Sequence, residues 1–380
     1  MSFEISKHQR ECSAQLEALL QARIAALGPI PFAEYMQYAL YHTPLGYYRN
    51  GSVKFGPGGD FVTSPEVSSL FSHSLARQCM PVLSDCAAPA IVEVGAGSGQ
   101  LAADLLTYLQ SKKALPDAYY ILELSADLQQ RQRHLLAERL PDYIQNVHWI
   151  TELPRDGFEG VVLANEVLDA MPVNVFYWDN GFGERYVDYV DGQFVWCDGK
   201  LSSSGLQQAL ASLPIPHAER YVSEVNLQLP AWIKSLSRAL TKGVMLLIDY
   251  GYARSQYYHP VRSAGTLMCH LQHQAWEDPF RYVGLQDITA HVDFTAVAEA
   301  AVDNGCAVLG YIEQGRFLIN LGIDDLILSE STDIQYTQAQ QVKQLVMPNQ
   351  MGERFKVIAL GKDFTQELQG FAQGDQLYQL

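Results

Sequence analysis

Residues 91–101 read Ile91-Val92-Glu93-Val94-Gly95-Ala96-Gly97-Ser98-Gly99-Gln100-Leu101. An apolar run ends in an acidic residue, three alternating glycines follow, and a helical pattern then begins. This order predicts a β-strand, a tight turn and the start of a helix. Glycine at such a turn permits a positive φ and lets a ligand approach the main chain. The spacing E-x-G-x-G-x-G differs from the G-x-G-x-x-G of dinucleotide enzymes, which directs helix amides at a pyrophosphate.

A second acidic strand end follows the glycine turn. Glu123 comes directly after the apolar run from Tyr119 to Leu122. An acid roughly twenty to thirty residues after such a turn suits the hydroxyls of a ribose. The two elements together resemble class I methyltransferases, whose glycine turn holds the amino-acid part of S-adenosylmethionine. A purely structural strand-to-helix turn is the alternative. The resemblance implies a set of cofactor-binding residues, namely Glu93, Gly95, Gly97, Gly99, Glu123, Ser125 and Asn165.

The composition narrows the class of protein. The 380 residues are 48% hydrophobic and 18% charged, which is typical of a soluble globular protein with one large domain and a cap or insertion. A net charge of −16 argues against a non-specific nucleic-acid binder and favours a cationic partner. The six cysteines form no C-x-x-C pair, which indicates reduced thiols. No apolar run approaches the roughly 20 residues of a membrane span. Residues 1–11 lack the apolar region of a secretory signal, so we expect a cytoplasmic location.

From residue 89 onward, predicted strands alternate with predicted helices. Such alternation predicts a parallel sheet with helices on both faces, and ligands then bind beyond the carboxyl ends of the strands. The strands 307–313 and 355–360 are expected to complete the sheet as an antiparallel pair. The alternation predicts an α/β fold, and the resemblance to class I methyltransferases implies their Rossmann-like seven-stranded sheet. The other predicted elements are strands 90–94, 119–123, 147–150, 160–164 and 243–249, and helices 99–110 and 126–139.

Segments outside the alternation predict additional parts. Residues 1–88 should form a helical N-terminal cap and a cofactor-covering loop, with helices at 13–27, after Pro31, and at 66–79. Asp-Asn-Gly and Asp-Gly turns between apolar runs predict antiparallel strands in an inserted substrate subdomain. The predicted domain boundaries are 1–88 for the cap, 89–173 and 231–362 for the core, 174–230 for the inserted subdomain, 252–289 for a loop-rich insertion and 363–380 for a C-terminal tail.

The end of the fourth core strand carries the candidate chemistry. Asn165, Glu166 and Asp169 place an amide and two carboxylates there. Methyl transfer requires an acceptor lone pair held about 3 Å from the methyl carbon and in line with the breaking bond. A guanidinium acceptor stays protonated because its pKa exceeds about 12, and a bidentate carboxylate can orient it. We expect Glu166 to be this clamp and Asp169 to be second. The alternatives are a solvated Glu166 and an Asp169 that caps a helix.

Histidines form a second group of candidates. His291 is expected to line the acceptor site as a hydrogen-bond partner or proton acceptor, a role that histidine suits near neutral pH. A buried structural histidine is the alternative. His270, His273 and Asp293 invite a metal-binding interpretation. However, no cysteine accompanies them at zinc spacing and methyl transfer needs no metal, so we predict none.

Five segments give the chain a more specific resemblance. They are Gly59–Ser68 (GDFVTSPEVS), Val92–Gly99, Asn165–Val173 (NEVLDAMPV), Ile248–Gly251 (IDYG) and Asp287–Phe294 (DITAHVDF). They resemble the MidA family from about Phe32 to Lys362. The resemblance implies a class I fold, S-adenosylmethionine as cofactor and arginine methylation of a protein substrate. The mitochondrial member of that family acts on an arginine of a respiratory complex I subunit and supports complex I assembly.

The Gly59–Ser68 segment is expected to fold over the cofactor. Asp60, Thr63 and Ser64 can donate or accept hydrogen bonds to its methionine part or shape the acceptor channel. Ser64 followed by Pro65 is also a typical helix start, with serine as the N-cap and proline as the first helical residue. Both interpretations of Ser64 stay open at this stage.

The leading hypothesis is an S-adenosylmethionine-dependent methyltransferase that acts on an arginine of a protein. Three alternatives remain: a methyltransferase for a small-molecule N or O acceptor, a cofactor-binding assembly factor with little catalytic activity, and an NAD-dependent oxidoreductase. The glycine spacing counts against the last of these. The sequence specifies neither the target nor an oligomeric state.

Overall fold

The computed structural model describes residues 5–50, 62–216, 220–327 and 332–380. The chain divides into two compact units. The second unit combines residues from the predicted N-terminal cap, the predicted inserted subdomain and the predicted loop-rich insertion. The sheet unit comprises Val62–Val167, Pro230–Gly251 and Phe294–Leu380, and the second unit comprises Met1–Phe61, Leu168–Leu229 and Tyr252–Asp293.

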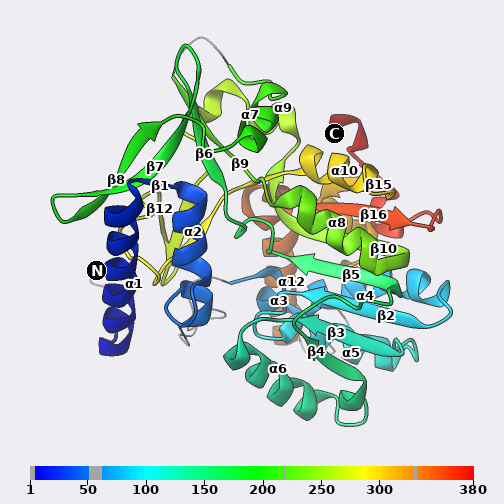
Figure 1. The fold of residues 1–380 in the computed structure, drawn as a ribbon. Coiled ribbons are helices and arrows are strands. Elements are labelled where there is room, and N and C mark those ends of the chain that lie inside the picture. The colour runs from blue at the N-terminus through cyan, green and yellow to red at the C-terminus, as the bar shows by residue number, and fades with distance from the viewer. Residues whose placement is uncertain (1–4, 51–61, 217–219, 328–331) are drawn as a thin grey trace. The chain divides into compact units, whose positions relative to one another are not determined.

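The sheet unit is built on strands in the order β15-β16-β10-β5-β2-β3-β4 (Figure 1). The five strands from β10 to β4 run parallel, whereas β16 lies antiparallel between β10 and β15. This order confirms the predicted class I methyltransferase sheet and its antiparallel closing pair. The bounds are β2 (Pro89–Val94), β3 (Ala118–Leu122), β4 (Val147–Ile150), β5 (Phe158–Asn165), β10 (Leu240–Tyr252), β15 (Ala307–Glu313) and β16 (Phe355–Lys362).

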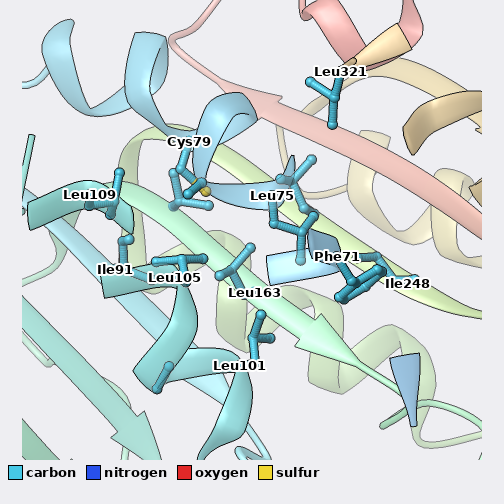
Figure 2. Close-up of a cluster of buried hydrophobic side chains, with 14 of the residues drawn as sticks. Phe71, Leu75, Cys79, Ile91, Leu101, Leu105, Leu109, Leu163, Ile248 and Leu321 are labelled. Atoms are coloured by element: carbon cyan, nitrogen blue, oxygen red, sulfur yellow. The ribbon is translucent and has the colours of Figure 1, made fainter. Parts of the chain in front are cut away.

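Helices separate most of these strands along the chain and build a buried core against the sheet. Leu101, Leu105 and Leu109 repeat every four residues and line one side of α5, so that helix presents an apolar stripe to its neighbours (Figure 2). Each fully buried leucine stabilises the fold by about 1.5–3 kcal/mol. The helices of this unit are α3 (Ser64–Val67), α4 (Ser69–Ser84), α5 (Gln100–Ser111), α6 (Ala126–Arg139), α8 (Leu229–Ala239), α10 (Phe294–Val302), α11 (Gln314–Asn320) and α12 (Thr332–Val346).

The single helix predicted at 66–79 is wrong, because two helices occupy this region. Ser68 separates α3 from α4 and has extended backbone angles of φ −160° and ψ 138°. Its hydroxyl accepts a hydrogen bond from the Leu70 N–H at 3.3 Å and so caps α4. Serine favours such local bonding to the main chain over a place inside a helix. The break leaves α3 as a short, separate turn.

The described residues of the second unit form two antiparallel sheets. The larger has the order β1-β7-β6-β9, with β8 paired to β7, and the smaller has the order β12-β11-β13. Asn180 and Asp191 adopt positive φ at the turns between β6 and β7 and between β7 and β8, which confirms the predicted turns. The strands of these two sheets are β1 (Ile30–Pro31), β6 (Asn174–Trp178), β7 (Phe182–Val190), β8 (Gln193–Gly199), β9 (Tyr221–Val225), β11 (Met268–Leu271), β12 (Gln274–Trp276) and β13 (Asp287–Thr289). The short strand β14 (Val292–Asp293) is part of neither sheet.

The helices of the second unit contribute to a separate core. This core combines buried side chains such as Leu16, Phe32 and Val187, which come from two helices and a strand. The first helix begins earlier than predicted, because the N-cap Ser6 and Gln9 in the first helical turn form a reciprocal capping box. No helix among the described residues is long and apolar enough to cross a membrane. The helices are α1 (Lys7–Leu27), α2 (Phe32–Tyr41), α7 (Ser204–Ala211) and α9 (Arg254–Tyr257).

Candidate functional site

The strand register brings several predicted site residues to one edge of the sheet unit. Val94, the last residue of β2, pairs with Leu122 of β3 and with Ala164 of β5. Asn165 in turn pairs with Ile248 of β10. Neighbouring strands lie about 4.8 Å apart, so the segments that follow these residues are close neighbours. The glycine turn and the acidic strand ends therefore meet at the carboxyl edge, where an open parallel sheet binds its ligands.

The glycine turn has a backbone that other residues rarely adopt. Gly95, Gly97 and Gly99 have φ values of 68°, 54° and 87°, all in the left-handed region. A Cβ atom on Gly95 would lie 3.2 Å from Val167 Cγ2, and one on Gly99 would lie 3.2 Å from Gln132 Cγ. Each contact is tighter than a relaxed carbon–carbon contact of about 3.5–4.0 Å. The turn is thus a close-packed bend that glycine alone occupies without strain.

Glu93 lies inside the sheet unit. Its carboxyl is buried, and Oε2 accepts a hydrogen bond from the Tyr119 hydroxyl at 2.7 Å. Burial, and to a smaller extent the charge of Glu123, raises the pKa of Glu93 to about 7. The carboxyl therefore supports the end of β2 from within, and a direct contact between Glu93 and a cofactor stays a prediction.

Glu123 stands directly after β3 and is bonded from two sides. Its Oε1 accepts from the Ser125 N–H at 2.8 Å, at the start of α6, and its Oε2 accepts from Gln132 Nε2 at 3.3 Å. The same Gln132 nitrogen donates to the Gly97 carbonyl at 2.9 Å, and Gln132 Oε1 accepts from Trp149 Nε1. Gln132 thus ties the carboxylate to the glycine turn. It is absent from the predicted site residues, because a glutamine within a polar helix carries no signal of burial.

Glu166 has an unusual backbone for a glutamate. Its φ of 55° lies in the left-handed region, a conformation that costs about 1–3 kcal/mol and often marks functional sites. The Glu166 N–H donates to the Ile248 carbonyl at 2.9 Å, which holds the conformation. Its Oε1 accepts from Asn165 Nδ2 at 3.1 Å and from the Ser64 N–H at 3.3 Å. The carboxylate is therefore oriented by its chain neighbour Asn165 and by the start of α3.

Asp249 is a further acid at this edge and is absent from the predicted site residues. It is fully buried near the end of β10. Its Oδ2 accepts from the Val167 N–H at 3.1 Å, and its Oδ1 accepts from the Tyr250 N–H at 2.9 Å. Asp249 thus fixes Val167, the residue after Glu166, and the Val167 side chain packs against Gly95. Its position directly after the apolar run Leu246-Leu247-Ile248 is the same sequence signal that identified Glu123.

The three residues predicted to cover the cofactor, Asp60, Thr63 and Ser64, have different outcomes in the structure. Thr63 occupies the N-cap position of α3 without a side-chain capping bond, and Ser64 is the first helical residue. The prediction of Ser64 as N-cap is therefore wrong. Its buried hydroxyl donates instead to Gln314 Oε1 at 3.2 Å, because the helix begins one residue earlier than predicted. Asp60 lies outside the described residues.

Asp169 and His291 belong to the second unit and lie near each other there. The Ala290 N–H donates to the Asp169 carbonyl at 2.9 Å. The His291 N–H donates to Thr266 Oγ1 at 3.1 Å, and its ring centroid lies 5.3 Å from that of Tyr252. The described residues after Asp169 form a turn and not a helix, so the helix-cap alternative does not apply. Catalytic roles for both residues stay predictions.

The remaining histidine cluster has other partners. His270 lies in β11 opposite Asp287, and burial lowers its pKa. Asp293 forms an ion pair with Arg254, whose Nε lies 3.1 Å from Asp293 Oδ2. Within the described ranges, no group of three or more His, Cys, Asp and Glu side chains could hold a metal ion.

The edge of the sheet unit fits S-adenosylmethionine. The glycine turn offers a close approach to the main chain, and Glu123 offers a carboxylate whose oxygens can each accept more than one hydrogen bond. Asn165 Oδ1 is buried, and none of the described residues donates a hydrogen bond to it. Such an acceptor suits an amine or hydroxyl donor of a ligand. Gly95, Gly97, Gly99, Glu123 and Asn165 are thus the residues expected to hold the cofactor.

Comparison with known proteins agrees with this assignment. A family model described as "Putative S-adenosyl-L-methionine-dependent methyltransferase" matches residues 74–312. A crystal structure of a Burkholderia thailandensis protein bound to S-adenosyl-homocysteine is 41% identical, with a TM-score of 0.94 and 100% of both chains covered. The protein arginine methyltransferase NDUFAF7 of Danio rerio is 31% identical and covers 90% of this chain and 85% of its own. Its Homo sapiens counterpart is also 31% identical, with coverage of 90% and 82%.

The relatives correct one prediction. The NDUFAF7 proteins are mitochondrial, so the cytoplasmic location expected from residues 1–11 is wrong by this comparison. The reason is physical: a short polar N-terminal stretch excludes a secretory h-region, but it carries no positive information about a compartment.

The matched family model spans more than half of the chain and includes the glycine turn, Glu123 and Glu166. The cofactor assignment agrees with the S-adenosyl-homocysteine found in the Burkholderia thailandensis structure. The chain belongs to the MidA-type family of class I S-adenosyl-L-methionine-dependent methyltransferases.

Proposed function

We propose that this methyltransferase modifies an arginine side chain of a protein substrate and that Glu166 orients the acceptor guanidinium. The observation that carries the proposal is the geometry of Glu166. It holds a left-handed backbone that costs free energy, and its carboxylate is aimed by Asn165 and by the Ser64 N–H. Val167, the next residue, packs toward the glycine turn. The carboxylate is thus set beside the segment expected to hold the cofactor.

The names of the relatives support the same acceptor. The NDUFAF7 proteins, about 30% identical over most of this chain, are named protein arginine methyltransferases. A net charge of −16 also favours a cationic protein substrate over a nucleic acid. These observations support arginine over a small-molecule acceptor.

The chemistry of the acceptor explains why a carboxylate is useful. When bound, S-adenosylmethionine supplies a methyl group on a positively charged sulfur. A guanidinium is also positive and repels that charge, and Glu166 offsets the repulsion. A carboxylate can hold two N–H groups of the planar guanidinium and so fix the direction of the third nitrogen. Asp169 and His291 are kept as further proposed catalytic residues, since a histidine can take up the proton that the methylated product releases.

The test is to incubate the protein with methyl-labelled S-adenosylmethionine and a lysate of its source organism, and then to map the label by mass spectrometry. We expect label on an arginine side chain of a protein. Label on a small molecule or on a different residue type would overturn the arginine assignment. Binding of S-adenosylhomocysteine without any transfer would instead favour the role of a cofactor-binding assembly factor.

A further inference from the structure

The short helix α3 makes polar contacts with two parts of the site. Ser98, between Gly97 and Gly99, donates its hydroxyl proton to Glu66 Oε1. Two residues earlier on the same helical turn, the Ser64 N–H donates to Glu166 Oε1 at 3.3 Å. One helical turn therefore joins the glycine bend to the carboxylate of the proposed clamp.

We propose that Glu66 is a positioning residue that links the cofactor turn to Glu166 through α3. The inference rests on the proposed function, because it takes Glu166 as the residue that orients the acceptor. Glu66 itself touches no reacting atom in this account. Its carboxylate accepts the hydrogen bond from Ser98, and the Ser64 N–H on the same helical turn donates to the Glu166 carboxylate.

The main chain of α3 is rigid enough to carry this link. The Glu66 and Val67 N–H groups both donate to the Thr63 carbonyl, at 2.9 and 3.1 Å. Pro65 has a fixed φ, which removes one rotation between Ser64 and Glu66. A shift of the Glu66 carboxylate therefore has to move the Ser64 N–H as well.

Two other helices, α11 and α12, anchor α3 and the residue that follows it. The buried Ser64 hydroxyl donates to Gln314 Oε1 of α11 at 3.2 Å, and Gln314 Nε2 donates to the Leu345 carbonyl of α12 at 3.2 Å. Ser68 Oγ donates to Gln341 Oε1 of α12 at 3.1 Å. These bonds anchor α3 and the adjoining Ser68 to α11 and α12, which supports α3 as a fixed link between its two contacts with the site.

The Ser98 side chain bonds the glycine bend to two neighbouring segments. Its hydroxyl oxygen also accepts from the Gln100 N–H at 3.3 Å, at the start of α5. The hydroxyl therefore connects the bend, the first turn of α5 and Glu66. A hydrogen bond to a carboxylate is roughly twice as strong as one between neutral groups, so Glu66 constrains this hydroxyl more than a neutral partner would.

The first arm of the test needs no acceptor. Calorimetry should show that Glu66→Ala and Ser98→Ala each weaken S-adenosylhomocysteine binding by roughly tenfold, as expected for losing one charge-assisted hydrogen bond. The double variant should be no weaker than either single variant, because both remove the same bond. Glu66→Gln keeps an oxygen acceptor but loses the charge, so it is the matched intermediate, with a loss of affinity of only about threefold. If the loss of affinity in the double variant equals the product of the two single losses, the Glu66–Ser98 link is wrong.

The second arm measures methyl transfer at saturating cofactor. In the wild-type background, Glu166→Gln should slow transfer by about a hundredfold. In the Glu66→Ala background the same change should slow it by less than about tenfold, since Glu166 is already misoriented there. Equal factors in the two backgrounds would reduce Glu66 to a purely structural residue. Thermal unfolding of each variant excludes loss of fold as the cause.

The two arms separate failure of this inference from failure of the proposed function. If the wild-type protein methylates no arginine, the proposed function is wrong, while the first arm still decides whether Glu66 and Ser98 act as one unit. If arginine is methylated and the losses are independent in both arms, the positioning role of Glu66 is wrong and the proposed function stands.

Discussion

Replacing Gly95 by alanine tests how the glycine bend serves the cofactor. Gly95 has a φ of 68°, and an added Cβ would lie 3.2 Å from Val167 Cγ2. An L-residue in the left-handed region costs about 1–2 kcal/mol, and the valine methyl must also move by a few tenths of an ångström. The total strain of Gly95→Ala is therefore about 1–2 kcal/mol or slightly more.

The strain can appear in either of two measurements. If the bend keeps its shape in the free protein, the free energy of unfolding falls by about 1–2 kcal/mol. If the bend relaxes in the free protein, the cofactor must restore the strained shape when it binds. The Kd for S-adenosylhomocysteine then rises by roughly 5- to 30-fold, because 1.4 kcal/mol corresponds to a factor of ten. The two losses together should add up to the strain.

Gly305→Ala is the matched control within the same unit. Gly305 has a φ of 78°, and a Cβ added there would have no described atom within 4 Å outside its chain neighbours. It should therefore lose stability of about 1 kcal/mol without any loss of affinity. Calorimetric titration with S-adenosylhomocysteine and urea unfolding measure both quantities for both variants. The reasoning is refuted if Gly95→Ala changes neither quantity, or if Gly305→Ala weakens binding to the same extent.

Three further predictions concern the sheet unit. Glu123→Ala should weaken S-adenosylhomocysteine binding by at least about tenfold in calorimetry, because a charged hydrogen-bond acceptor is lost; unchanged affinity would exclude a ribose contact. Since the pKa of Glu93 is raised to about 7, the folded protein holds a proton that the unfolded chain releases above about pH 4.5, and stability falls as the pH rises toward 7. Urea unfolding should thus show Glu93→Gln gaining up to about 3 kcal/mol relative to wild type between pH 5 and 8, and a constant difference would contradict the raised pKa. Leu109→Ala, in the core shown in Figure 2, should lower the free energy of unfolding by about 2–5 kcal/mol and leave binding unchanged; a loss below 1 kcal/mol would contradict its buried packing.

The fold was predictable because its main signals are local. Several core strands are short apolar runs that end at or directly before a polar or acidic residue, as in Tyr119–Leu122 and Val161–Asn165. The break at Ser68 was not predictable, because the sequence around it continues a helical apolar pattern. Its extended backbone is stabilised by bonds to Leu70 nearby and to Gln341, which lies 273 positions further along the chain.

The candidate site was predictable only in part, for a related reason. Glycines and acids at strand ends are visible in the sequence, whereas the residues that orient them act across long chain separations. Gln132 reaches back 35 positions to Gly97, and Asp249 reaches back 82 positions to Val167. Glu66 likewise accepts a hydrogen bond from Ser98, and it lies on α3, which the sequence pattern does not separate from α4. A buried polar side chain becomes informative only when its partner is known.

The central claim is that the Glu166 carboxylate orients a cationic acceptor and contributes little to cofactor binding. Single-turnover methyl transfer by Glu166→Gln, with S-adenosylhomocysteine affinity measured in parallel, tests it most directly. We predict an affinity within about twofold of wild type and transfer to arginine slowed by about a hundredfold, the usual effect of removing one preorganised electrostatic contact. Transfer at the wild-type rate, or a loss of affinity that accounts for the whole decrease, would contradict the claim.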